Sequence, residues 1–94
     1  MRSELVPIGS SIRPELLRLP IGTINASTPR EFGQQIRRRR TELGLSQSAL
    51  ADVVGVNRRV IGELERGKAS VQVGIALRVA VAVGLDVALV ERPR

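Results

Sequence analysis

The sequence predicts an all-α domain of four to five short helices, followed by one short β-strand that pairs across a dimer. Three observations predict this class: residues 45–68 hold two helical patterns separated by a glycine, residues 28–31 form a helix-capping sequence, and residues 71–83 repeat apolar side chains at helical spacing. The chain has 94 residues. That length suits one domain with a marginal core, to which a second subunit would add.

Residues 1–27 are expected to form a flexible N-terminal arm. Pro7, Pro14 and Pro20, together with several early glycines and serines, would interrupt any long helix. The same segment is rich in leucine and isoleucine, so an alternative stays open in which it folds against a partner protein.

Residues 28–84 are expected to form the helix-turn-helix domain, and its first helix should run to about residue 43. Thr28 supplies the N-cap hydroxyl, a proline occupies the first helical position, and Glu31 stands at the third. Gly44 is the expected C-terminal stop. Three apolar residues form the predicted buried stripe: Phe32, Ile36 and Leu43.

Residues 45–68 predict two short helices joined by a tight turn. Ser46 is a suitable N-cap for the first helix and Gly55 its stop, while Asn57 caps the second helix and Gly67 ends it. This is the helix-turn-helix pattern, whose second helix enters the major groove of DNA. The predicted inner faces are Leu50, Ala51 and Val54 in the first helix and Val60, Ile61 and Leu64 in the second.

The outward residues at the start of the second helix are Asn57, Arg58 and Arg59. The guanidinium fork of arginine matches the O6 and N7 acceptors of guanine, so these positions suit base reading. The alternative is that two adjacent arginines only form a solvated face.

Residues 71–83 predict a fourth helix, capped by Ser70 and ended by Gly84. Its many valines would also suit a buried strand, but its length and alanine content favour a helix. Apolar residues on nearly every face of this helix indicate burial on more than one side, and therefore a dimer interface.

Residues 85–94 are expected to form a C-terminal dimerisation strand and tail. A lone strand needs a partner, and the chain offers no other clear strand. We therefore expect the strand to pair with its copy in a second subunit, through Val87, Ala88, Leu89 and Val90.

Two features of the sequence resemble known families. The spacing of Gln47, Ala51, Gly55, Val56, Ile61 and Leu64 resembles the Xre/lambda-repressor class of helix-turn-helix domains, over roughly residues 32–90. A basic domain followed by LRVAVAVGLDVALV, at residues 77–90, is similar to the HipB-type antitoxins. Those proteins pair a C-terminal strand across a dimer, bind operator DNA and hold a HipA-type kinase toxin, but their pattern lacks a long N-terminal arm.

The resemblance implies roles for particular residues. Gln47 should contact the DNA backbone and the recognition helix, and residues 57–59 match the base-reading positions. Arg40 and Glu65 match an Arg–Glu pair of the repressors, so we expect a buried salt bridge between the first and third helices. Glu63 could accept from cytosine N4 but would otherwise repel phosphate. We also assign two further basic residues to DNA binding: Arg38 and Lys68.

The composition supports a polyanionic partner. There are 15 Lys and Arg residues against 9 Asp and Glu residues, a net charge of +6. Phe32 is the one aromatic residue, which argues against single-strand binding by base stacking. The absence of cysteine and histidine excludes disulfides and His-based metal or acid–base sites, and no cofactor is expected. No apolar run approaches the length of a membrane span, so we expect a cytoplasmic, nucleoid-associated protein without a membrane partner.

Together these patterns predict a homodimeric, sequence-specific repressor that binds double-stranded operator DNA. The predicted role is the antitoxin of a HipBA-like operon that represses its own promoter and binds a HipA-like kinase toxin. No nucleophile–base pair is recognisable, so the protein is not expected to be an enzyme. Two alternatives stay open: a phage or plasmid regulator without a toxin partner, and an interaction module that neutralises a toxin without binding DNA.

Overall fold

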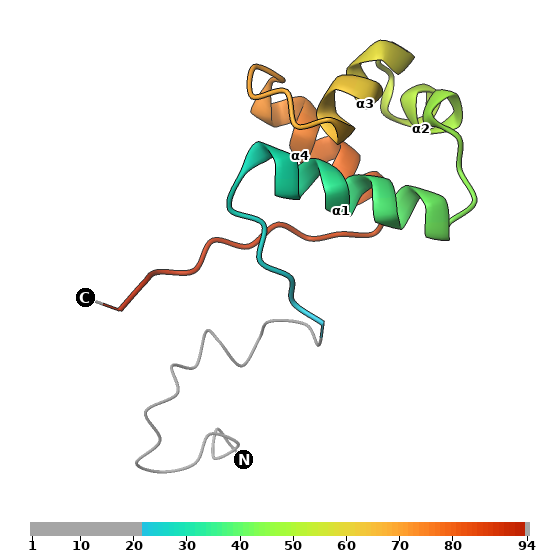
Figure 1. Ribbon diagram of the computed structural model, residues 1–94. Helices are drawn as coiled ribbons and strands as arrows, with labels where there is room; N and C mark the ends of the chain where they lie inside the picture. The colour runs from blue at the N-terminus through green and yellow to red at the C-terminus, as the bar shows by residue number, and fades with distance from the viewer. Residues whose placement is uncertain (1–21, 94) are drawn as a thin grey trace. The chain divides into compact units, whose positions relative to one another are not determined.

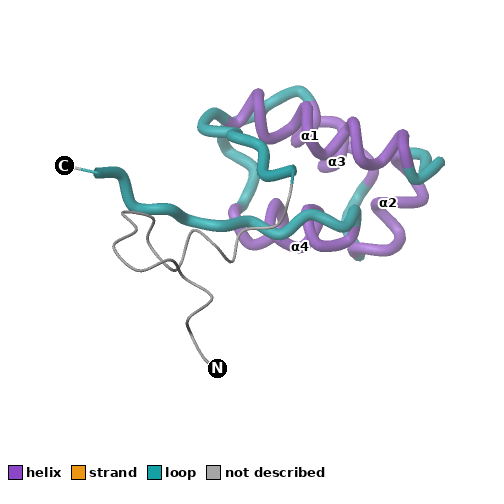
Figure 2. Tube along the Cα trace, turned by 90° about the horizontal axis from the view of Figure 1, so that it is seen from below, coloured by secondary structure: helices purple, strands orange, loops and turns teal. Residues whose placement is uncertain are grey.

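The computed structural model of the protein describes residues 22–93, and residues 25–87 form a compact helical unit (Figure 1). Four helices follow in order: α1 (Pro29–Glu42), α2 (Gln47–Val54), α3 (Arg58–Glu65) and α4 (Val73–Ala82). Helix α3 packs against both α1 and α2, and α4 packs against α2 (Figure 2). The described residues contain no strand, and none of their helices is long and apolar enough to cross a membrane. The predicted all-α class is confirmed.

The first three helices begin at the predicted caps. The hydroxyls of Thr28 and Ser46 accept from the backbone N–H groups of the third helical residues of α1 and α2, and the Asn57 carbonyl oxygen accepts from the second of α3. The carboxylate of Glu31 reaches back to the backbone N–H of Ser27, 2.9 Å away. That hydrogen bond, more than those from the hydroxyls nearby, lowers the pKa of Glu31. Gly55 ends α2 in the left-handed region, at φ +84°, which an L side chain rarely adopts.

The core lies between the helices and is made of aliphatic side chains from all four. Leu43 does not belong to it, and this prediction is wrong: α1 ends at Glu42, and Leu43 follows as its C-cap with 48% of its surface exposed. Phe32 is half-buried against the core. The buried apolar residues are Ile36, Leu50, Ala51, Ile61, Leu64, Val79, Ala80 and Val83.

Helices α1 and α3 approach each other closely at Gly33. A Cβ atom there would lie 2.2 Å from the carbonyl oxygen of Leu64 and 2.8 Å from that of Glu65, and both oxygens belong to the backbone. A glycine is therefore required at position 33 by the neighbouring helix, whereas its own helical backbone would accept alanine.

Helix α4 differs from its prediction at the start. It begins after Gln72, which makes no side-chain capping bond, so Ser70 does not cap it. The inner face, with Val79 and Ala80, is fully buried. The other face leaves apolar side chains in solvent, and we call this row the outer row of α4: Val73, Leu77 and Val81, which are 72%, 42% and 67% exposed.

Residues 1–21, which hold most of the predicted arm, lie outside the described residues. Residues 85–93 form neither helix nor strand in the single chain. The predicted strand concerns pairing with a second subunit, so it stays a prediction.

Candidate nucleic-acid interface

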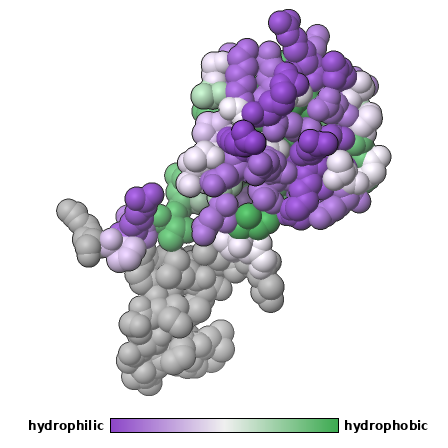
Figure 3. Space-filling model, viewed as in Figure 1, coloured by the Kyte–Doolittle hydropathy of each residue, from purple (hydrophilic) through white to green (hydrophobic). Residues whose placement is uncertain are grey.

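The start of α3 presents two arginines to solvent. Asn57 lies just before the helix, and its Oδ1 accepts the backbone N–H of Arg59 at 2.8 Å. Arg58 and Arg59 then occupy the first turn, and the Arg59 side chain is 80% exposed. The helical surface in the view of Figure 3 is largely hydrophilic. Because the carbonyl oxygen of Asn57 is used by the cap, its amide N–H groups remain for a partner.

Gln47 joins Arg58 to the interior. Nη1 of Arg58 donates to Oε1 of Gln47 at 2.8 Å, and Nε2 of Gln47 donates to Oε1 of Glu65 at 3.0 Å. Gln47 is the first residue of α2, directly after the Ser46 cap. The turn that starts α2 therefore also places the Gln47 amide between Arg58 and Glu65. The arginine is thereby held before any partner is present.

Arg40 and Glu65 form the buried end of this chain of hydrogen bonds. Nε and Nη2 of Arg40 donate to the two carboxylate oxygens of Glu65 at 2.6 Å and 3.0 Å, and Nη1 donates to the carbonyl of Leu45 at 2.8 Å. The two side chains are only 12% and 4% exposed. The hydrogen bond to Glu65 raises the pKa of Arg40, so the guanidinium stays charged. The pair ties α1 to α3 beside the Gly33 crossing.

Glu63 holds the other two predicted DNA-binding cations near α3. Its Oε2 lies 3.6 Å from Nε of Arg59 and 3.2 Å from Nζ of Lys68. The Lys68 side chain is 52% exposed. The structure therefore gathers Arg59 and Lys68 around one carboxylate, whereas Arg58 is held by a neutral amide.

Arg38 is bound within its own helix. It donates to Gln35 at 2.8 Å and to Glu42 at 2.9 Å, both in α1. Arg39 also donates to Glu42, and the hydrogen bonds from Arg39 and Arg38 lower the pKa of that carboxyl. Arg39 further donates to the carbonyl of Val83 at the end of α4. The assignment of Arg38 to DNA binding stays a prediction.

Sequence reasoning did not single out Arg66. A Cβ placed on Gly62 would lie 3.2 Å from Nη1 of Arg66 and 3.8 Å from Oε1 of Gln47, so this guanidinium lies over the helix next to the glutamine. Positions 58, 62 and 66 recur at helical spacing, and that spacing is the signal that could have identified it. Arg66 thus adds a cation to the exposed surface of α3.

The predicted dimer residues are exposed in the single chain. Val87 and Val90 are about half exposed and Leu89 is almost fully exposed, at 48%, 49% and 98%. Ala88 is exposed as well. Their pairing with a second subunit stays a prediction.

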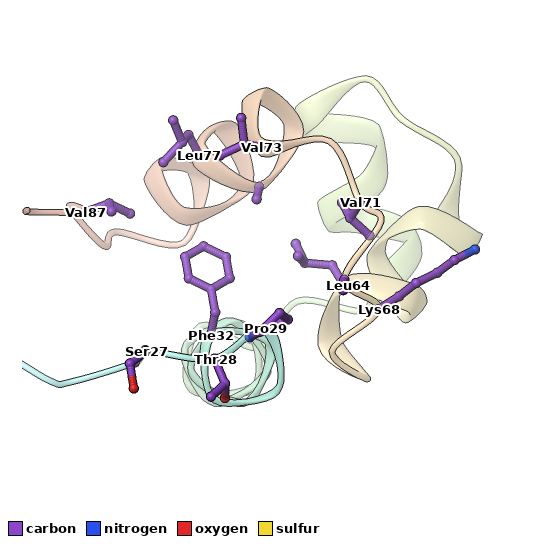
Figure 4. A pocket seen from close by; sticks show the side chains of 13 residues that line it. Ser27, Thr28, Pro29, Phe32, Leu64, Lys68, Val71, Val73, Leu77 and Val87 are labelled. Carbon is purple, nitrogen blue, oxygen red and sulfur yellow. The ribbon is translucent and has the colours of Figure 1, made fainter.

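A shallow apolar groove of about 340 Å³ lies between the start of α1 and α4 (Figure 4). Phe32 stands on the α1 side, Leu77 on the α4 side, and Val87 at one end. The residues 68–71 that follow α3 contribute Lys68 and Val71. The lining is suited to apolar side chains and offers little to a polar ligand.

Comparisons with known proteins agree with this geometry. A family model described as helix-turn-helix matches residues 36–90. An uncharacterized HTH-type transcriptional regulator of Methanothermobacter thermautotrophicus is 49% identical over 51 residues, which are 54% of this chain and 74% of that protein. The HTH-type transcriptional regulator y4mF of Sinorhizobium fredii is 40% identical over 60 residues, 64% of this chain and 79% of that protein.

Solved structures share the fold. HipB in the HipB–O4 20-mer complex and in the HipA–HipB–O2–O3 complex matches 76% of this chain and all of that chain, with a TM-score of 0.68 and 17% identity in each case. The restriction-modification controller protein C.AhdI from Aeromonas hydrophila is 38% identical, with a TM-score of 0.56 over 62% of this chain and 88% of that chain.

Proposed function

The chain belongs to the helix-turn-helix family and is a DNA-binding transcriptional regulator of the Xre type, and from this we propose that it is a homodimeric, sequence-specific repressor that controls its own operon as an antitoxin. The observation that carries the proposal is the exposed start of α3, where Asn57, Arg58 and Arg59 present donors on one short helix. Such donors match the acceptor edge of guanine in the major groove.

The proposed docking places α3 in the major groove with Arg58 and Arg59 at base edges. Gln47, at the start of α2, and Lys68, after α3, contact phosphate on either side. Phosphate contacts fix the register of a protein on DNA, while base contacts supply sequence preference. The hydrogen bond between Gln47 and Arg58 supports this division, since it ties a phosphate-binding position to a base-reading one.

The proposed dimer uses the outer row of α4 together with residues 87–90. These apolar side chains are exposed in the single chain, and burying them would be favourable by about 25 cal/mol per Å². A two-fold axis there would set two copies of α3 about one DNA turn apart, roughly 34–36 Å, on an inverted repeat. A chain cut after Gly84 should be largely monomeric by sedimentation, and a truncated chain that stays a dimer at low micromolar concentration would place the interface on the helices alone.

The antitoxin role rests on the likeness of residues 77–90 to the HipB-type sequence and on the fold shared with HipB. A HipA-like kinase is the proposed partner. One observation favours a second candidate: the 38% identity to C.AhdI is higher than the identity to HipB, and it supports a controller of restriction-modification genes.

The test is purification of the full-length protein from its native operon, with footprinting on the upstream DNA. Protection of an inverted repeat at physiological salt and a co-purified kinase are the expected results. Protection without a kinase would favour the controller candidate or a phage or plasmid regulator. If a kinase co-purifies but the protein does not bind DNA, the repressor function is rejected and the protein is an interaction module.

A further inference from the structure

Glu63 is an acidic residue among the cations assigned to DNA binding. Arg59 precedes it by four residues, so the two side chains share one face of α3, with Nε of Arg59 3.6 Å from Oε2 of Glu63. Nζ of Lys68 approaches the same oxygen at 3.2 Å. The Glu63 side chain is only 20% exposed. One carboxylate therefore neutralises two groups that would otherwise attract phosphate.

We propose that Glu63 is a specificity-determining residue. Its carboxylate lowers the affinity of the protein for every duplex. Part of the lost affinity returns only on a duplex in which the N4 amino group of a cytosine faces the carboxylate in the major groove and donates to it. This inference rests on the proposed function and adds to it the base preference of a residue outside the assigned site.

The loss applies to any sequence because phosphates are identical along DNA. Arg59 or Lys68 can bind a phosphate only by leaving Glu63, which exchanges one ion pair for another. The carboxylate of Glu63 would also repel any phosphate that approaches Arg59 or Lys68. Affinity for random DNA comes almost entirely from cation–phosphate contacts and counterion release, so this is the component that Glu63 reduces.

The recovery depends on the base. An ionised carboxylate is purely an acceptor, and cytosine N4 is the donor with which glutamate pairs in the major groove. A G·C pair presents the O6 and N7 acceptors of guanine beside that donor. Arg59 and Glu63 present a donor fork and an acceptor side by side, so together they match both bases of one G·C pair.

Glu42 provides a matched control on α1. It also holds two cations, Arg38 and Arg39, each at 2.9 Å. Replacing either glutamate by glutamine removes one negative charge and two ion pairs. Both cations beside Glu63 are assigned to the interface, whereas of the two beside Glu42 only Arg38 is. A difference in DNA affinity between the two variants therefore depends on where the glutamate lies and not on the net charge of the protein, which is the same in both.

The experiment compares full-length wild type, Glu63→Gln and Glu42→Gln on two probes, a random-sequence duplex and the duplex that wild type selects from a random library. Each freed cation should steepen the salt dependence by about 0.9 in log K against log salt, a factor of about eight at 0.1 M salt. We expect Glu63→Gln to bind the random duplex about eightfold tighter or more, and its preference for the selected duplex to fall. Glu42→Gln frees one assigned cation, Arg38, so it should tighten random-duplex binding less than Glu63→Gln does and should leave the preference for the selected duplex unchanged.

Two further variants separate the charge of Glu63 from its contact with a base. Glu63→Asp retains the charge and should bind random DNA as wild type does. Selection repeated with Glu63→Ala should lose a cytosine preference at one position and keep the others. Equal random-DNA affinity for Glu63→Gln and Glu42→Gln, or an unchanged selection with Glu63→Ala, would overturn the inference while leaving the repressor intact. A wild-type protein that selects no duplex would instead reject the proposed function.

Discussion

The two faces of α3 are built from different chemistry. On the inner face, Ile61, Leu64 and Glu65 are buried, and the one charge among them is bonded to Arg40 through both of its oxygens. On the outer face, Arg58 and Arg59 are exposed, and within residues 22–93 their side chains bond to the amide of Gln47 and to the carboxylate of Glu63 respectively. The same eight-residue helix thus packs into the core on one side and, in the proposed function, reads DNA on the other.

The two faces of α3 are joined through one residue of α2. Gln47 donates to Glu65 on the inner face and accepts from Arg58 on the outer face. Substitutions on the inner face should therefore change stability first and recognition second, while substitutions on the outer face should change recognition alone. The following variants, in order of expected effect, test this separation.

Glu65→Gln should be the most destabilising. It leaves Arg40 charged and buried beside a neutral amide, and breaking a buried ion pair costs about 3–5 kcal/mol. For a domain of this size each kcal/mol corresponds to roughly 4–8 °C in Tm, so melting should fall by about 10 °C or more. Glu63→Gln, two residues along the same helix, is the control and should shift Tm by little. An unchanged Tm for Glu65→Gln would remove the stabilising role of the pair.

Gly33→Ala should come next. The added methyl would meet backbone oxygens at 2.2 Å and 2.8 Å, so α1 and α3 must separate, and overpacking of this kind costs about 1–3 kcal/mol. The control is Gly74→Ala in α4, where nothing lies within 4 Å and alanine is the better helix former, by up to about 1 kcal/mol. Urea unfolding of the two variants should move in opposite directions. A Gly33→Ala protein as stable as wild type would show that the crossing can relax.

Arg58→Ala and Arg59→Ala should leave stability within about 0.5 kcal/mol, because both side chains are exposed. Binding to the selected duplex should weaken by about 1–3 kcal/mol, with relaxed preference at one position in each case. Titration of selected and random duplexes separates base reading from phosphate binding. Equal losses on both duplexes would mean that these arginines contact only the backbone.

The smallest effect is expected from acid. The pKa values of Glu31 and Glu42 are lowered in the folded chain, by hydrogen bonds from Ser27 and from Arg39 respectively. A carboxyl whose pKa is lower in the folded state stabilises the protein above its unfolded pKa of about 4.3, and that contribution is lost as pH falls through the folded value. Tm should therefore decline below about pH 4.3, and less steeply in a Glu31→Gln, Glu42→Gln double variant. If Tm falls equally steeply with pH in the wild type and the double variant, groups other than Glu31 and Glu42 cause the decline.

Local features of the fold were predictable from sequence. The caps at Thr28, Ser46 and Asn57 and the stop at Gly55 depend on a few consecutive residues, and the structure confirms them. Gly33 was not predictable, because its requirement comes from the backbone of another helix. The prediction that Leu43 is buried is wrong for a different reason: α1 ends at Glu42, one residue before the predicted buried stripe does.

The site was predictable only as a set of residues. Residue types and family resemblance identified Gln47, Arg58 and Arg59 as candidates, and their roles on DNA stay predictions. Which group each one bonds in the free protein depends on side-chain geometry across α2 and α3. The position of Arg66 beside Gln47, and the apolar groove, also require the packed helices.

The amide orientations at the start of α3 give this surface a hydrogen-bond polarity. Oδ1 of Asn57 is taken by the backbone N–H of Arg59, and Oε1 of Gln47 is taken by Arg58. Both amide oxygens therefore already accept a hydrogen bond from the protein itself, and the guanidinium groups have no acceptor to offer. A duplex docked on this turn meets an array of donors, which suits runs of acceptors along a base edge, and the nearest carboxylate that could accept from an amino group is that of Glu63, beside Arg59. To read an adenine with both groups of its amide, Asn57 would have to share Oδ1 between its own helix cap and the N6 amino group of the base, through the second lone pair of that oxygen.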